Sequence, residues 1–229
     1  MNEDDPRAAQ KRRAGRRAAE FVADGDVVGL GTGSTAAAAI EALGEAVADG
    51  TSIRGIPTSY QSRALALESG IPVTALDAVD GVDVAIDGAD QVADGALIKG
   101  GGGAHAREKI VDAAADRFVV VVDPSKEAET LSHPVPLEVL PSARPPVMDA
   151  VRELGGTPQL RDADEKDGPV ITEQGNLVLD CDFGTIEDPA GLATSLAGIP
   201  GVVEHGLFVG LADVIVVGGP DGVRVRSTV

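Results

Sequence analysis

The chain has 229 residues, enough for one sizeable domain or for one domain with a smaller companion, and 43% of them are hydrophobic, which excludes wholesale disorder. Aromatic residues make up only 2%, so the core must be built from aliphatic side chains, as in a parallel sheet covered by helices. The net charge of −18 argues against nucleic acid and against an anionic membrane as partners.

The basic residues are mostly arginine, and lysine is scarce. Only five of the 19 basic residues are lysines. An acidic, lysine-poor surface predicts a halophilic protein, since molar salt screens the repulsion between carboxylates. The single cysteine, Cys181, excludes an internal disulfide and fits a reducing compartment. With no secretory segment and no apolar run of 18 residues, we expect a cytoplasmic protein that does not enter a membrane.

The first part of the chain alternates between helical and strand-like segments. Helices are predicted at 7–23, 34–48, 60–69 and 104–116, and strands at 27–30, 53–56, 72–74, 82–86 and 118–122. This alternation predicts an α/β fold with a Rossmann-like, doubly wound, mostly parallel sheet.

A cluster of five prolines between residues 134 and 146 predicts a crossing into a second domain. Beyond it the predicted order is strand, helix, strand, strand, helix, strand, which is the ferredoxin-like α+β arrangement. These elements are expected at 135–140, 145–154, 158–161, 176–181, 189–196 and 201–205. Residues 207–217 return to strand character and are expected to rejoin the first sheet. The predicted domains are therefore 1–131 plus 207–229, a catalytic α/β domain, and 132–206, a smaller domain flanking the cleft or a subunit interface.

A glycine-rich turn, Gly-Thr-Gly-Ser-Thr at 31–35, follows the first predicted strand and opens a helix. Its backbone N–H groups, hydroxyls and helix dipole suit a phosphate group. A dinucleotide site is a weaker alternative, because the third glycine and a ribose-binding acid are missing. A tight turn with a Ser or Thr helix cap is the structural alternative.

Two further segments carry chemistry. Asp87 and Asp90 lie in the turn Asp-Gly-Ala-Asp after the strand at 82–86, and Lys99 precedes four consecutive glycines that are followed by Glu108. Bare glycine N–H groups can surround an anionic oxygen. Neighbouring carboxylates raise the proton affinity of one another and a lysine lowers it, which suits general acid–base catalysis. Metal binding by these acids, with His105, is the rival interpretation.

Two other lysines lie beside strand ends or basic segments. Lys126 follows the strand at 118–122, where side chains reach the ligand crevice of an open α/β sheet; an exposed loop lysine is the alternative. The segment from Lys11 to Arg17 holds five cations. Contact with nucleic acid conflicts with the acidic remainder, so we expect a helix face paired with acids, with Lys11 or a neighbour reaching the phosphate of a ligand.

A series of motifs, in this order along the chain, resembles ribose-5-phosphate isomerase of the A type. They are Gly-Thr-Gly-Ser-Thr at 31–35, Thr-Ser at 58–59, Asp-Gly-Ala-Asp at 87–90, Lys-Gly-Gly-Gly at 99–102 with Arg-Glu-Lys at 107–109, Asp-Pro-Ser-Lys at 123–126, and the segments Leu-Glu-Val-Leu-Pro at 137–141 and Ile-Pro-Gly-Val-Val-Glu-His-Gly-Leu-Phe at 199–208. The chain departs from the family at Gln91, where a glutamate is usual.

The resemblance implies a site and a reaction. It implies phosphate binding by Thr32, Gly33, Ser34 and Thr35, a reacting end lined by Asp87, Gly88, Ala89, Asp90, Lys99, Gly100, Gly101 and Gly102, a catalytic base at Glu108, and a substrate contact at Lys126. The implied reaction interconverts ribose 5-phosphate and ribulose 5-phosphate through an enediolate, without cofactor or metal, in a homodimer or homotetramer. Another sugar-phosphate isomerase or deaminase, or a non-catalytic sugar-phosphate sensor, are the alternatives.

Overall fold

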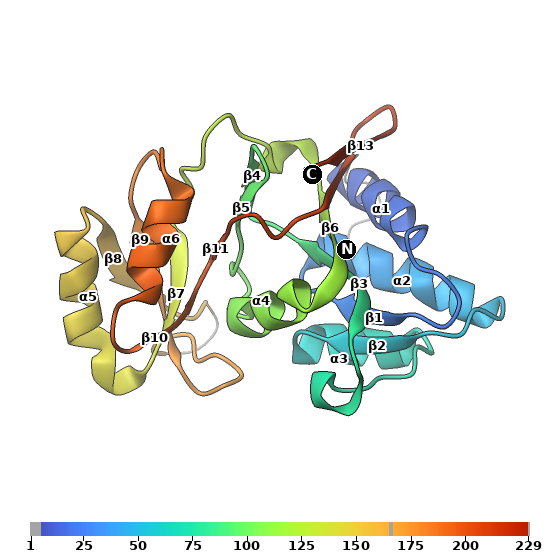
Figure 1. Cartoon of the computed structure of the whole chain (residues 1–229), viewed down its shortest axis with the longest axis horizontal. Coiled ribbons are helices and arrows are strands. Elements are labelled where there is room, and N and C mark those ends of the chain that lie inside the picture. Colours follow the sequence, from blue (N-terminus) through green and yellow to red (C-terminus); the bar gives the residue numbers. More distant parts are fainter. Residues whose placement is uncertain (1–5, 165–166, 229) are drawn as a thin grey trace. The chain divides into compact units, whose positions relative to one another are not determined.

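The computed structural model describes residues 6–164 and 167–228 (Figure 1). Within this part the chain forms two compact units. The larger unit holds the described residues up to Ala89, then Arg107–Glu127, and those from Leu211 onward; the smaller unit holds Asp90–Ala106 and Ala128–Gly210. The predicted boundaries differ from these units chiefly at residues 90–106, which were expected in the first domain.

The larger unit contains a six-stranded sheet in the order β13-β12-β6-β3-β1-β2. All its neighbouring strands are parallel except β12 and β13, so the predicted doubly wound, mostly parallel sheet is confirmed. Its elements are α1 (Pro6–Ala19), β1 (Val27–Leu30), α2 (Ser34–Ala48), β2 (Arg54–Pro57), α3 (Tyr60–Glu68), β3 (Val82–Gly88), most of α4 (His105–Ala113), β6 (Ala115–Val122), β12 (Val214–Gly218) and β13 (Val223–Ser227), with short 3-10 turns at Leu76–Ala78 and Pro124–Lys126.

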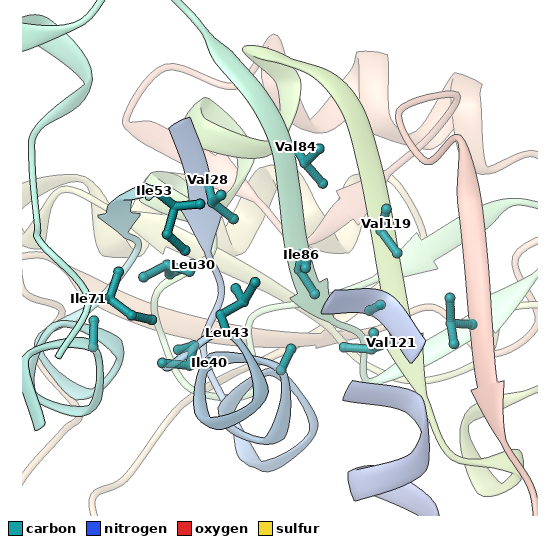
Figure 2. Close-up of a cluster of buried hydrophobic side chains, with 14 of the residues drawn as sticks. Val28, Leu30, Ile40, Leu43, Ile53, Ile71, Val84, Ile86, Val119 and Val121 are labelled. Atoms are coloured by element: carbon teal, nitrogen blue, oxygen red, sulfur yellow. The ribbon is translucent and has the colours of Figure 1, made fainter. Parts of the chain in front are cut away.

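Helices cover both faces of this sheet. On one face, Val28 and Leu30 of β1 pack with Ile40 and Leu43 of α2 in a cluster that also includes small residues of α1 (Figure 2). On the other face, Val27 belongs to a cluster with Val111 of α4. Alternate residues of a strand point to opposite faces, so the four-residue apolar run of β1 is buried throughout.

The smaller unit contains a four-stranded antiparallel sheet in the order β10-β7-β9-β8 and a three-stranded sheet in the order β11-β5-β4. Its elements are β4 (Gln91–Ala93), β5 (Ala96–Ile98), β7 (Val135–Val139), a 3-10 turn at Pro141–Ala143, α5 (Arg144–Glu153), β8 (Thr157–Leu160), β9 (Leu177–Asp182), α6 (Pro189–Ala197), β10 (Val202–His205) and β11 (Leu207–Phe208). The predicted order of strands and helices from β7 to β10 is confirmed, and their pairing is that of a ferredoxin-like sheet.

Two expectations about strands are wrong, and one hairpin was missed. The expected strand at 72–74 is only an isolated bridge between Val73 and Gly55. Of residues 207–217, only β12 joins the first sheet, whereas β11 pairs with β5. The hairpin of β4 and β5 was not predicted, although its turn carries the signal Asp94-Gly95, whose φ angles are 43° and 81°.

None of the described helices is long and apolar enough to span a membrane. Cys181 lies in β9 and is buried. Burial, and secondarily the charge of Asp180, raises the pKa of its thiol to about 12. The thiol is therefore protonated at neutral pH and behaves as a small apolar core residue.

Candidate active site

The carboxyl ends of β1 and β3 lie side by side in the larger unit, because these strands are parallel neighbours. The chain moves from β1 to β2 on one side and from β3 to β6 on the other, so the strand order changes direction between β1 and β3. Open α/β sheets bind their ligands outside the carboxyl ends at such a point. The glycine-rich turn follows β1 and Asp87 lies near the end of β3, so both motifs come to this edge.

The glycine-rich turn starts α2 without a side-chain cap. Gly33, with φ of 98°, is the residue before the helix, and glycine has no side chain to bond the first N–H groups. The structural alternative of a Ser or Thr cap is therefore wrong at this helix. Ser34 is exposed, and its Oγ accepts a hydrogen bond of 2.9 Å from Nζ of Lys11 in α1. Thr35 follows in the first turn of α2. This helix start joins a cation, a hydroxyl and backbone N–H groups.

The carboxylate of Asp87 is fully buried and tied to the turn after β1. Its Oδ1 accepts hydrogen bonds from the backbone N–H groups of Thr32 at 3.0 Å and Gly88 at 2.6 Å. Gly31 is required here, because a Cβ at this residue would lie 2.6 Å from Cα of Asp87 and closer still to its carboxylate. Ala89, two residues beyond Asp87, is the last residue of this part of the larger unit.

The hydroxyl of Thr32 hydrogen-bonds to residues outside the glycine-rich turn. It donates to Oγ of Ser59 at 2.8 Å and lies 2.9 Å from Oγ1 of Thr58. The Thr-Ser pair after β2 thus links the ends of β1 and β2. The sequence singled out this pair only by family resemblance, and its bond to Thr32 is a finding of the structure.

Glu108 lies in the first turn of α4 and is 4% exposed. Val111, one turn later, packs so closely on β1 that a Cβ at Gly29 would lie 2.7 Å from its Cγ1. Val111 shares a cluster with Val27 and Val82, which begin their strands, so α4 runs from the carboxyl edge of the sheet toward the amino edge. Residues three apart share a helix face. Glu108 therefore lies on the sheet-facing side of α4, toward the carboxyl edge.

Lys126 follows the carboxyl end of β6 in a short 3-10 turn. Asp123 fixes this turn, because its Oδ1 accepts from the backbone N–H of Ser125 at 2.9 Å and from the hydroxyl of Ser125 at 2.5 Å. Since β6 is parallel to β3 and adjacent to it, Lys126 lies at the same edge of the sheet as Asp87. Lys126 is half-buried, whereas the alternative interpretation expected an exposed loop lysine.

The smaller unit holds Asp90, Lys99 and the glycine loop of residues 100–103. Oδ2 of Asp90 accepts a hydrogen bond of 2.7 Å from the backbone N–H of Gly101. Lys99 is 2% exposed, and its Nζ lies 5.3 Å from the centre of the Phe208 ring. Gly101 and Gly102 are exposed, whereas Gly100 is buried. The two aspartates of the 87–90 turn thus belong to different units, each bonded to backbone N–H groups of its own unit.

Two residues lie beside this loop: Arg161, which was not predicted, and His105, which the sequence offered in the rival metal interpretation. Arg161, just after β8, donates from one guanidinium nitrogen to the carbonyl oxygens of Gly100 at 2.9 Å and Gly101 at 3.0 Å. The ring of His105 fills the space that a side chain at Gly100 would need. No local sequence signal marks Arg161, because its partners lie about sixty residues away.

Gln91, where the resembling family has a glutamate, has a structural role. Its Oε1 accepts hydrogen bonds from the backbone N–H groups of Ser132 at 2.7 Å and His133 at 2.8 Å. A glutamate oxygen could accept both bonds equally. Among residues 6–164 and 167–228, no group of three or more His, Cys, Asp or Glu side chains is placed to hold a metal ion.

Comparisons with known proteins agree on one family. Residues 54–222 match the family model described as ribose 5-phosphate isomerase A (phosphoriboisomerase A). The chain is 67% identical over 219 residues to ribose-5-phosphate isomerase A of Haloarcula marismortui, covering 96% of each chain. It is similar to the solved ribose 5-phosphate isomerase A of Methanocaldococcus jannaschii (44% identity, TM-score 0.92, 99% of this chain and 100% of that one). A solved D-ribose-5-phosphate isomerase in complex with phospho-erythronic acid has 43% identity and a TM-score of 0.94, over the same shares of the two chains.

Proposed function

The chain belongs to the ribose-5-phosphate isomerase A family, and on that premise we propose how its residues carry out the reaction. This membership confirms the resemblance found in the motifs. The reaction of the family interconverts ribose 5-phosphate and ribulose 5-phosphate. Chemically, the C2 proton of the aldose is removed, an enediolate forms, and a proton is delivered to C1 to give the ketose. Family membership favours this activity over the deaminase and sensor alternatives.

Glu108 is the proposed general base. The observation that carries this role is its burial on the sheet-facing side of α4, toward the edge where the turn after β1 and Asp87 also lie. A base held away from bulk water needs little reorganisation to take a proton from C2 and return it at C1. Asp87, held by two backbone N–H groups, is proposed to exchange protons with the sugar hydroxyls and to help open the furanose ring.

Lys99 and the loop amides are the proposed stabilisers of the developing oxyanion. A buried ammonium and the peptide N–H of Gly102, an exposed residue of the loop, are the kinds of donor that such a charge needs. Asp90 is proposed to share proton transfer with Asp87. Because its Oδ2 already accepts from Gly101, it also holds the loop in shape.

The start of α2 is the proposed phosphate site, with Thr32, Gly33, Ser34 and Thr35 as its turn. Lys11 supports this role, because it lies within hydrogen-bond distance of Ser34 at an uncapped helix start. Thr32 is proposed to act through its backbone position, since its hydroxyl bonds Thr58 and Ser59. Lys126, at the same edge of the sheet, is the proposed additional substrate contact.

Replacing Lys11 is expected to weaken binding of the phosphate end. The variant Lys11→Met loses a charge-assisted hydrogen bond worth about 1.5–3 kcal/mol, so KM for ribose 5-phosphate should rise about 10- to 100-fold while kcat changes far less. Arg16→Met is the matched control, because Arg16 lies on the same helix and pairs with Glu45 in an exposed ion pair. Initial-rate kinetics measure both; an unchanged KM in Lys11→Met would remove it from the phosphate site.

The activity is tested by incubating the protein with ribose 5-phosphate in deuterated water. We expect ribulose 5-phosphate to form and to carry solvent deuterium at C1, since the base exchanges its proton with solvent before returning it. Nuclear magnetic resonance of the product shows both. Absence of ketose would contradict the proposed function, and ketose without label would contradict free exchange at the base.

The acidic composition supports work in high salt, as do the haloarchaeal relatives. We expect activity and the unfolding temperature to rise between dilute buffer and molar potassium chloride, because salt screens the repulsion between carboxylates. Thermal unfolding and initial rates across this range measure the effect. Best performance in dilute buffer would contradict halophily.

Three further properties are proposed from the sequence. A homodimer or homotetramer, a cytoplasmic location and independence from metal are expected. Light scattering tests the first and cell fractionation the second. Dialysis against a chelator tests the third, where loss of activity that is restored by a metal ion would contradict independence.

A further inference from the structure

We propose that Arg161 is a positioning residue for the isomerase reaction, which holds the peptide groups of the glycine loop in the orientation that oxyanion stabilisation requires. This inference rests on the proposed function, because it assigns the loop amides to the oxyanion. All the contacts that carry it lie within the smaller unit and join the loop at residues 100–103 to Asp90 and to Arg161, which in turn binds Asp180 of β9.

The carbonyl contacts of Arg161 fix two successive peptide planes. In a trans peptide the C=O and N–H bonds point in opposite directions, and the described chain has no cis peptide. The carbonyl of Gly100 shares its plane with the N–H of Gly101, and the carbonyl of Gly101 shares its plane with the N–H of Gly102. By binding both carbonyls, Arg161 turns both N–H groups to the opposite side of the loop.

The plane between Gly100 and Gly101 is held from both ends. Arg161 binds its carbonyl oxygen, and Oδ2 of Asp90 accepts its N–H at 2.7 Å. The next plane has Arg161 on its carbonyl, which leaves the exposed Gly102 N–H as the donor whose direction depends most on this side chain. Within the loop, the N–H of Gly103 donates to the carbonyl of Gly100 at 2.9 Å. Because glycines have wide backbone freedom, the external contacts add to this turn bond in keeping one arrangement of the loop.

Arg161 is itself fixed by a two-point contact with Asp180 of β9. Its Nε donates to Oδ2 at 2.8 Å, and one terminal nitrogen binds Oδ1. The pair is partly buried, with side-chain exposures of 16% and 32%. The planar guanidinium can serve the carboxylate with one edge and the two carbonyls with its remaining nitrogen, whereas a lysine ammonium cannot reproduce this fork. The chain therefore uses arginine here for its geometry as well as its charge.

The test compares Arg161→Lys and Arg161→Met with the wild-type protein. The matched control is Arg152→Met in the same unit, since Arg152 pairs with Asp149 in an exposed ion pair on α5. We expect kcat to fall about 10- to 100-fold in both Arg161 variants, because misplaced catalytic groups cost roughly this much, with KM for ribose 5-phosphate changing less than about threefold. Arg152→Met should match the wild type in both.

A binding measurement separates positioning from general structural support. Phospho-erythronic acid carries a carboxylate whose charge resembles that of an enediolate, whereas inorganic phosphate probes only the phosphate end. By calorimetry, the Arg161 variants should lose about tenfold in affinity for the acid and keep the wild-type affinity for phosphate. If Arg161→Met does not fold, the affinities for the acid and for phosphate are compared in Arg161→Lys and in Asp180→Asn. The second variant removes the charge that fixes Arg161.

The outcomes distinguish this inference from the function on which it rests. A wild-type protein that forms no ketose overturns the proposed function. An active wild-type protein with folded Arg161 variants of unchanged kcat overturns the positioning role alone. Equal losses of affinity for the acid and for phosphate, together with a lowered unfolding temperature, also overturn it, since they indicate general structural support.

Discussion

Glu108→Gln is expected to fold normally and to lose nearly all turnover. The amide keeps the size of the side chain and one acceptor oxygen but cannot accept the C2 proton, and a positioned general base contributes about 10²- to 10⁴-fold to the rate. We expect kcat to fall at least about 1000-fold, with KM much less affected. Steady-state kinetics measure this loss, and circular dichroism checks that the burial of Glu108 tolerates the neutral group.

The matched control is Glu41→Gln, which neutralises an exposed glutamate of α2 in the same unit. Its kcat should equal that of the wild type. If Glu108→Gln still exchanges the C2 proton of ribose 5-phosphate with solvent at the wild-type rate, another group is the base. Asp87, buried in the same unit, would then be the next candidate.

Gly31→Ala is expected to have the second largest effect, because the added methyl group would overlap the carboxylate of Asp87. Either Asp87 or the turn must move, and both are joined by the Thr32 hydrogen bond. We expect kcat to fall about 100-fold from misplacement of this carboxylate and the free energy of unfolding to fall by about 1–3 kcal/mol from overpacking. Kinetics and chemical denaturation measure the two losses separately.

Gly81→Ala provides the matched control for this change. Gly81 is exposed, and a Cβ there would meet no atom within 4 Å. Its activity and stability should stay near the wild-type values. A fully active Gly31→Ala would mean that the reaction does not depend on the observed position of Asp87.

Patterns local to the sequence predicted most of the fold. The apolar run at 27–30 lies between an Asp-Gly-Asp turn and a glycine-rich turn, and β1 has these bounds. The antiparallel unit was predicted from the order of its elements alone. The strand at 72–74 failed because propensity cannot tell a full ladder from the single bridge that Val73 makes with Gly55. The β4–β5 hairpin was missed although Asp94-Gly95 marked it.

The candidate site was predictable where both residues of a hydrogen bond lie in segments that the sequence had marked. The turn after β1 and Asp87 are tied directly, and Lys11 reaches Ser34. The support of the glycine loop could not be predicted, because Arg161 binds carbonyls about sixty residues away and its side chain has no periodic or motif signal. Every residue has a backbone carbonyl oxygen, so the sequence does not show which of them an arginine binds. Such an arginine cannot be told from a surface arginine in the sequence.

The larger unit is interrupted twice along the chain and is completed only by its last segment, from Leu211 onward. Strand β12 pairs with β6, and residues joined across this pair, such as Phe118 and Asp213, are 95 positions apart. During synthesis on the ribosome, β6 therefore emerges long before β12. Until β12 is made, one edge of β6 has unpaired backbone groups, which can pair with the wrong strand. The proposed catalytic groups near β1 and β3 thus belong to a sheet whose strands β12 and β13 are added only after the smaller unit has been synthesised.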